Sequence, residues 1–347
     1  MRGRAFSVLF LPMLAISAPA QPAGSPAAWR FTSAQNEALP PVFRQGAAKR
    51  ADGSTQTFYI GNFNGGMDSH KPLLVFVDGS GAQSHFVRVG DRVGASLFGL
   101  IAQHAGAYHV AASEKRGVEF AARSTPGAGQ GASAEYNRHA TLQDRVADLR
   151  LLLDTLLAEP NVDTSRVLVI GHSEGADVAA VAAAEDKRIT HVAFLSGGGP
   201  PQFYDFYLMR RKEMRAAGAK PEEIEAAISQ LDGEIRDILD DPQSETRFWL
   251  GHAHKRWSTF ATTSAAEHLA KARARLFLAH GSEDRSVPIE SFDYLVFELL
   301  RAGRRDFTAR RYAGCDHGFM KAGEEPGSTP FLRVLDDALA WAAEAGK

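Results

Sequence analysis

Residues 167–175 read Val-Leu-Val-Ile-Gly-His-Ser-Glu-Gly, and this stretch carries most of the information on the fold. Its four leading apolar residues predict a buried strand, which runs directly into the pattern G-x-S-x-G centred on Ser173. Residues 176–184 are almost all small and predict a helix packed tightly on a sheet. A serine at such a sharp turn has a strained backbone, so small residues must flank it. Ser173 is therefore a candidate nucleophile.

A nucleophilic serine needs a base and an acid, and two later stretches supply candidates. The pattern G-x-S-x-G alone would occur by chance in roughly one chain in six at this glycine content, so these partners carry weight. Residues 276–279 predict a strand, and residues 280–288 continue as H-G-x-x-D-x-x-V-P, which places Asp284 after the carboxyl end of that strand. His317 lies in a loop of small residues, Gly-Cys-Asp-His-Gly, after the last predicted strand.

The chain from about Lys71 to its C-terminus resembles the α/β-hydrolase superfamily, close to the secreted esterase, dienelactone-hydrolase and serine-aminopeptidase-like branches. The serine turn, the H-G-x-x-D-x-x-V-P segment and the D-H-G-F segment match the family's pattern, and the chain order Ser, Asp, His is the family's order. The resemblance implies a triad of Ser173 as nucleophile, His317 as base and Asp284 as the acid that orients it. Because the family includes esterases, thioesterases, amidases and peptidases, it implies the mechanism more than the substrate.

An oxyanion hole must also be present if this chemistry holds, since fixed N–H donors stabilise the charge of the tetrahedral intermediate. One expected donor is the backbone N–H of Glu174, the residue after the nucleophile. The other is expected from the loop 77–81, Val-Asp-Gly-Ser-Gly, with Ser80 as first choice and Gly79 as second. Asp78 stands where the family usually has histidine, and a plain glycine turn is the alternative interpretation.

Short apolar runs alternate with helical patterns along the chain, which predicts an α/β fold with a mostly parallel central sheet flanked by helices. The spacing of apolar residues from Leu142 to Leu153 predicts a helix that Pro160 ends. Thr329 and Pro330 predict the start of a C-terminal helix. The predicted strands are residues 57–60, 73–77, 108–112, 167–170, 191–195, 276–279 and 307–312.

Residues 200–270 interrupt this alternation, because they contain no convincing strand pattern. Pro221 followed by two glutamates favours a helix start. Apolar residues then recur at three- and four-residue spacing from Ile224 to Ile238. We therefore expect a helical cap insertion at 200–270, with residues 29–199 and 271–347 forming the hydrolase core.

Several residues near the predicted triad have alternative roles. Glu283 is a second candidate for the acid, but Asp284 holds the pattern position. Asp316 is expected to brace its loop or to face solvent. Cys315, the single cysteine, is expected to be a small packed residue rather than a nucleophile. Because the chain has a single cysteine, no intramolecular disulfide can form.

Two further features are expected to be structural. Arg116 is expected to pair with a nearby carboxylate. His252 and His254 form H-x-H in the cap, and residues two apart on a helix do not face each other, so no metal site is predicted there.

The bulk composition excludes several classes of function. The chain has 347 residues and a formal net charge of −2, which gives no basic excess for nucleic acid. Arg2 and Arg4 precede an apolar run at residues 5–16 and a small-x-small site ending at Ala20. We expect residues 1–20 to be a cleaved signal peptide, residues 21–28 to be a flexible lead-in, and the product to be secreted or periplasmic with no stable membrane span.

The sequence thus predicts a serine hydrolase that cleaves carboxylic esters of small or medium size and needs no metal or organic cofactor. A serine peptidase, aminopeptidase or amidase with the same triad is the alternative. An aminopeptidase would need an acidic residue near the cap to bind a free amine, and Glu245, Asp205 and Asp241 are candidates. A non-catalytic binding protein is a third hypothesis, and the oligomeric state stays open.

Overall fold

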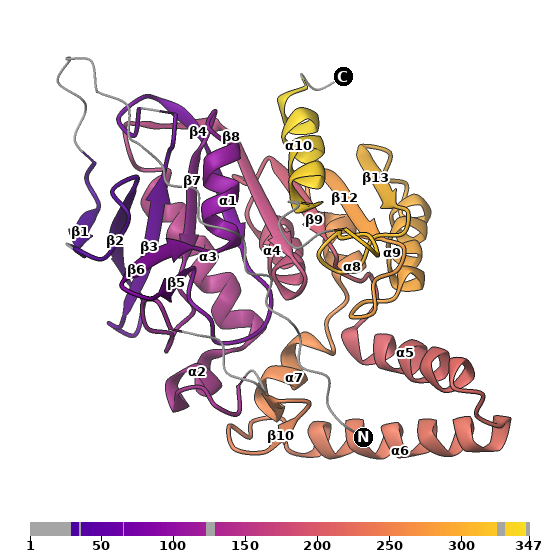
Figure 1. Ribbon diagram of the computed structural model, residues 1–347. Coiled ribbons are helices and arrows are strands. Elements are labelled where there is room, and N and C mark those ends of the chain that lie inside the picture. The colour runs from indigo at the N-terminus through magenta and orange to yellow at the C-terminus, as the bar shows by residue number, and fades with distance from the viewer. Residues whose placement is uncertain (1–28, 35, 65, 123–128, 325–329, 345–347) are drawn as a thin grey trace.

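In the computed structural model, which describes residues 29–34, 36–64, 66–122, 129–324 and 330–344, nine strands form a central sheet. Their order is β1-β2-β3-β7-β4-β8-β9-β12-β13 (Figure 1). The strands from β7 to β13 in this order are parallel, and β1, β2 and β3 pair antiparallel at one edge. The predicted mostly parallel sheet is therefore confirmed. The bounds are β1 (Thr32–Ala34), β2 (Phe43–Lys49), β3 (Thr55–Gly61), β4 (Lys71–Val77), β7 (His109–Ser113), β8 (Val162–His172), β9 (His191–Leu195), β12 (Arg275–Gly281) and β13 (Phe307–Tyr312).

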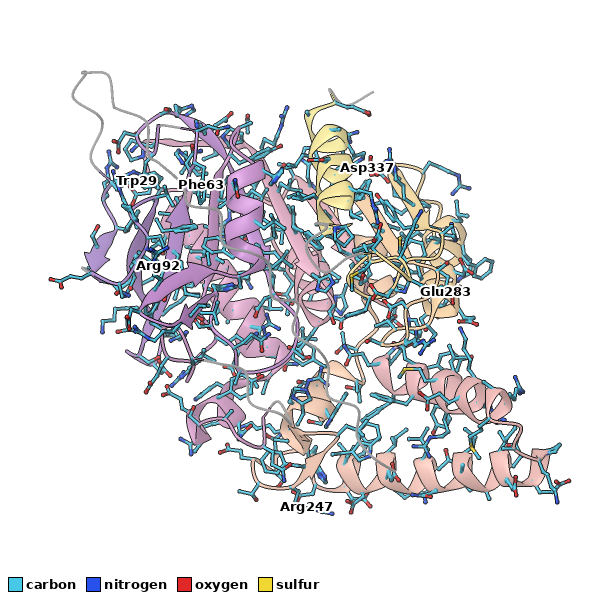
Figure 2. All side chains as sticks on the ribbon, in the orientation of Figure 1. Trp29, Phe63, Arg92, Arg247, Glu283 and Asp337 are labelled. Atoms are coloured by element: carbon cyan, nitrogen blue, oxygen red, sulfur yellow. The ribbon has the colours of Figure 1, made fainter. Side chains whose placement is uncertain are left out.

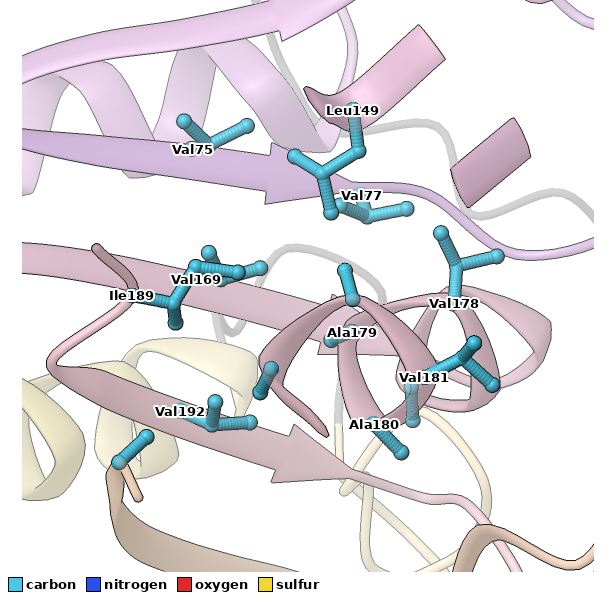
Figure 3. Close-up of a cluster of buried hydrophobic side chains, with 14 of the residues drawn as sticks. Val75, Val77, Leu149, Val169, Val178, Ala179, Ala180, Val181, Ile189 and Val192 are labelled. Carbon is cyan, nitrogen blue, oxygen red and sulfur yellow. The ribbon is translucent and has the colours of Figure 1, made fainter. Parts of the chain in front are cut away.

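Helices cover both faces of the sheet, and this explains why its central strands are apolar throughout. Side chains alternate between the faces of a strand. In β8, Val167 and Val169 join one core cluster, whereas Leu168 and Ile170 join the other. Figure 3 shows part of the first cluster, where side chains of β4, β8 and β9 meet those of α4. This cluster includes residues of α3 (Leu142–Leu156), α4 (Glu174–Glu185), α8 (Ala265–Lys271) and α9 (Ile289–Arg301), and the other includes residues of α1 (Leu97–His104) and α10 (Pro330–Ala343).

A helical segment lies between β9 and β12 in the chain. It contains α5 (Gln202–Ala216), α6 (Pro221–Asp240) and α7 (His254–Phe260). Helices α5 and α6 extend away from the sheet as an antiparallel pair (Figure 1). Their apolar faces meet α7 in a separate small core that includes Leu231, Ile238 and Trp257.

The structure differs from the sequence-based predictions in several places. Residues 200–270 contain a short hairpin of β10 (Phe248–Trp249) and β11 (His252–Ala253). Helix α8 packs against α4 and α9, so the predicted boundary at residue 270 falls inside a helix of the core. Helix α3 ends at Leu156, before Pro160. Strands β1, β2, β5 (Phe86–Val89) and β6 (Arg92–Ala95) and helices α1 and α2 (Ala134–His139) were not predicted.

The predicted signal peptide, the lead-in and Thr329 lie outside the described residues. Within the described part of the chain, no helix is both long and apolar enough to cross a membrane.

Candidate active site

Ser173 occupies a strained turn between β8 and α4. Its φ of 58° and ψ of −127° lie in a region that residues with a side chain rarely adopt. The flanking glycines are required by space: a Cβ on Gly171 would lie 2.2 Å from the Gly175 carbonyl oxygen. A Cβ on Gly175 would lie 2.1 Å from the carbonyl oxygen of Val77 in β4. This turn therefore holds Ser173 at the carboxyl edge of the sheet and at the amino end of α4.

His317 and Asp284 meet at the same edge, in the loops that follow β13 and β12. The Nδ1 atom of His317 lies 2.7 Å from Oδ2 of Asp284. The other carboxylate oxygen of Asp284 accepts hydrogen bonds from the backbone N–H groups of Ser286 (2.7 Å) and Val287 (3.0 Å). Burial alone would raise the pKa of Asp284, but the hydrogen bond and charge of His317 lower it below its ordinary value. Asp284 is thus held ionised beside the imidazole.

The backbone of His317 is held by hydrogen bonds to its carbonyl oxygen. Its carbonyl oxygen accepts a hydrogen bond from Ser196 Oγ (3.0 Å) and lies 3.1 Å from Nε2 of His172. Burial and the charge of His317 lower the pKa of His172 to about 4, so His172 is neutral at neutral pH and donates through Nε2–H. Asp316 braces the loop, since its Oδ1 accepts from the N–H groups of Gly318 and Met320, both at 2.9 Å. The structure therefore positions His317 through its backbone as well as its ring.

The loop after β4 runs against Ser173. A Cβ on Gly79 would lie 3.2 Å from Ser173 Cβ and 3.6 Å from Ser173 Oγ. Ser80 is exposed, and its carbonyl oxygen accepts from Gln83. The carboxylate of Asp78 forms ion pairs with Lys115 and Arg145. The predicted loop therefore lies against the nucleophile, and Asp78, which stands where the family usually has histidine, is paired with two cations.

Comparison with known proteins agrees with this geometry. A family model described as the alpha/beta hydrolase family matches residues 85–327. The chain belongs to this family. No curated protein matches it by sequence.

Several solved structures share the fold at low sequence identity. They include Porphyromonas gingivalis dipeptidyl peptidase 4 (TM-score 0.53, 15% identity) and Pyrococcus horikoshii acylaminoacyl peptidase (TM-score 0.55, 14% identity). Each match covers 86% of this chain but only 35% and 41% of those longer peptidases. A Klebsiella pneumoniae protein assigned as a dienelactone hydrolase (TM-score 0.53, 13% identity) is matched over 87% of this chain and 99% of its own. At these identities the likeness concerns the fold alone.

In this α/β-hydrolase, the alternative site residues do not contact His317 in the way that Asp284 does. Glu283 is exposed (Figure 2), whereas its neighbour Asp284 contacts His317. Cys315 is buried, and burial raises the pKa of its thiol. Arg116 pairs with Asp52 (2.6 Å) and Glu135 (3.1 Å), as expected.

The two cap histidines do not share one helix. His252 lies in β11 and His254 begins α7. Among the described residues, no group of three or more histidine, cysteine, aspartate or glutamate side chains is arranged to hold a metal ion.

Two buried acids, Asp177 and Asp205, have raised pKa values that the sequence does not predict, although Asp205 is one of the three acids considered for binding a free amine. Burial raises the pKa of Asp177 to about 8, although a hydrogen bond from Gln202 (2.6 Å) opposes the shift. Burial likewise raises the pKa of Asp205 to about 7, against a hydrogen bond donated by Ser291. Both carboxyl groups are therefore largely or partly protonated near neutral pH.

A set of buried charges beside the nucleophile was also missed. The side chain of Glu174 binds Arg145 and Arg256, and Arg145 also binds Asp78. Sequence patterns gave little signal for it, because Arg145 lies between apolar positions of α3 and Arg256 comes from the cap. The available clue was the charge of two side chains, that of Glu174, whose backbone N–H is a predicted oxyanion donor, and that of Asp78, which precedes Gly79.

Proposed function

We propose that the chain is a serine hydrolase that cleaves carboxylic esters of small or medium size through an acyl-enzyme on Ser173. The observation that supports this most is the convergence of three features at one edge of the sheet. Ser173 has the positive φ of a strained nucleophile turn, the loop of Gly79 lies against its side chain, and His317 is hydrogen-bonded to a buried carboxylate.

In this proposal His317 accepts the proton of Ser173 as the hydroxyl attacks the acyl carbonyl. Because Nδ1 is engaged by Asp284, Nε2 is the ring nitrogen left to act as base. The negative charge that develops on the carbonyl oxygen is stabilised by backbone N–H groups of Glu174 and of Gly79 or Ser80. His317 then protonates the leaving alcohol and later activates the water that releases the acid.

The cap chemistry favours an ester substrate over one with a free amino group. An aminopeptidase would need an unpaired carboxylate to bind that amine. Each of the three acids considered for this role already has a partner. Glu245 accepts from Lys255 (3.0 Å) and Arg138 (3.2 Å). Asp205 accepts from Ser291, and Asp241 lies 3.5 Å from Arg247.

A serine peptidase remains the alternative candidate, supported by the peptidase names of several proteins with this fold. The two proposals differ in the bond that is cleaved. The purified enzyme and Ser173→Ala would be compared on p-nitrophenyl esters of two to eight acyl carbons and on aminoacyl and N-acyl-aminoacyl p-nitroanilides. We expect Ser173-dependent turnover of the esters, with kcat/KM at least about 100-fold above the anilides. Faster turnover of the anilides would favour the peptidase.

A further inference from the structure

Buried charges connect the two backbone segments that flank Ser173. They are Asp78 after β4, Lys115 after β7, Arg145 in α3, Glu174 at the start of α4 and Arg256 in α7. The exposed fractions of Arg145, Glu174 and Arg256 are 9%, 5% and 4%. Charged groups are rarely buried to this degree because desolvation is costly, and the interaction often adds little net stability over apolar packing. Their position beside the nucleophile suggests a role other than stability.

Arg145 is the group that bridges the two segments. Its Nη1 donates to Oε1 of Glu174 at 2.6 Å. Its Nη2 donates to the backbone carbonyl of Asp78 at 2.7 Å and to the Asp78 carboxylate at 3.0 Å. A guanidinium is planar and presents its donors at fixed angles, so one side chain sets the separation of both partners. A lysine at this position would offer the charge without the two-armed geometry.

The bridged residues adjoin the atoms that the proposed reaction needs. Glu174 carries the N–H group next to Ser173, and Asp78 precedes Gly79, whose backbone lies against the Ser173 side chain. Lys115 holds the Asp78 carboxylate from the other side, and Arg256 Nε holds Oε2 of Glu174 at 2.8 Å. Each end of the Arg145 bridge is therefore held by a further cation, which is Lys115 at Asp78 and Arg256 at Glu174.

Oxyanion donors act through fixed geometry, because they gain their advantage by not reorganising as charge develops. A displacement of about 1 Å at a reacting centre can reduce the rate by about 100-fold. We propose that Arg145, through Glu174 and the Asp78 backbone, is a positioning residue that sets the spacing of the two oxyanion-hole segments. The inference rests on the proposed serine-hydrolase function.

Arg145→Lys tests this geometry with the charge retained. On p-nitrophenyl butyrate we expect kcat to fall about 10- to 100-fold while KM changes less than about twofold, since the bridge acts on the transition state. The Ki of an alkyl trifluoromethyl ketone, whose serine adduct places an oxyanion in the same site, should rise by the same factor as kcat/KM falls. A purely structural role would not link these two quantities.

Arg50→Lys is the matched control. Arg50 makes a similar two-armed pair with Asp148 of α3, at 2.6 and 2.8 Å, and does not contact Ser173, Glu174 or Asp78. Its kcat and Ki should equal those of the wild type. Should Arg145→Lys fail to fold, Glu174→Gln gives a second variant, which keeps the side-chain shape but weakens the bridge, and the same parallel loss is expected.

The outcomes separate the inference from the function beneath it. Ser173-dependent turnover by the wild type together with unchanged kcat and Ki in Arg145→Lys would overturn the positioning role alone. A raised KM at unchanged kcat would also overturn it and would make Arg145 a substrate-binding residue. Equal turnover by the wild type and Ser173→Ala would overturn both.

Discussion

His317 and Asp284, 33 residues apart in the chain, are joined by a 2.7 Å hydrogen bond from the imidazole Nδ1 to a carboxylate that is otherwise sealed from water. Two backbone N–H groups occupy the second oxygen of that carboxylate. Nε2 of His280 lies 3.5 Å from Oδ2, and the His280 ring stacks on Phe292. The carboxylate is thus hydrogen-bonded at both oxygens and shielded from solvent.

Asp284→Asn should reduce kcat by about 10³- to 10⁴-fold on a p-nitrophenyl ester that the wild type cleaves. The reason is that an amide can donate to Nδ1 and so select the wrong imidazole tautomer. Steady-state kinetics of the folded variant measures this. Glu283→Gln, one residue away and exposed, is the control and should keep the wild-type rate. The reverse pattern would assign the acid to Glu283.

Asp177→Asn should remove a loss of stability that develops as the pH rises from 3.8 to about 8. Burial raises the pKa of Asp177 from its ordinary value of 3.8 to about 8 in the folded state. Between these values the folded state binds more protons than the unfolded state, so the free energy of unfolding falls as pH rises through this window. Asparagine mimics the protonated acid and retains an acceptor for Gln202.

Thermal melts at pH 5 and pH 8 test this expectation. Asp177→Asn should raise Tm at pH 8 more than at pH 5. Asp240→Asn, on the exposed side of α6, should show no such difference between the two pH values. An equal fall in Tm at both pH values would show that Asp177 is ionised and needed as such.

Gly175→Ala should destabilise the fold by more than about 4 kcal/mol, because its Cβ would meet the backbone oxygens of Val77 and Asp78 at 2.1 and 2.6 Å. Gly233→Ala in α6 is the matched substitution, since a Cβ there has no atom within 4 Å. It should stabilise the protein by about 0.5–1 kcal/mol through helix propensity. Denaturant titration measures both, and a Gly175→Ala protein of wild-type stability would contradict the packing described for this turn.

Cys315 should not react in the native protein. It is 1% exposed, and burial raises its thiol pKa, so little thiolate is present near neutral pH. Iodoacetamide should modify it only after unfolding, as mass spectrometry would detect. Cys315→Ala should retain the wild-type rate. Loss of activity on native alkylation would give the cysteine a role in the site.

The strands of the parallel sheet could be predicted because they are buried on both faces. Residues 191–195 and 307–312 were predicted with the bounds that the structure has. Strand β2 was missed because Phe-Arg-Gln-Gly-Ala-Ala-Lys shows no alternation, and its place depends on pairing with β3. Helix α8 was assigned to the cap because sequence order does not reveal that it packs on α4.

The site residues also divide into those that a local sequence pattern predicts and those that it does not. A local motif marks Ser173, and patterns after strands mark Asp284 and His317, so the sequence suggests these three. The buried bridge joins Arg145 to Asp78, which lies 67 positions away in the chain, and to Glu174, which lies 29 positions away. Each of its members resembles an ordinary surface charge in sequence. Only the close approach of β4, α3 and α4 turns these charges into neighbours.

The most direct test of Ser173 as the nucleophile is labelling of the purified protein with a fluorophosphonate probe, beside Ser173→Ala. Tandem mass spectrometry of the labelled protein would locate the adduct. We expect stoichiometric labelling on Ser173 in the wild type and none in a folded Ser173→Ala variant. No labelling of a folded wild type, or an adduct on another residue, would contradict the assignment of Ser173 as the activated nucleophile and would favour a non-catalytic protein on this fold.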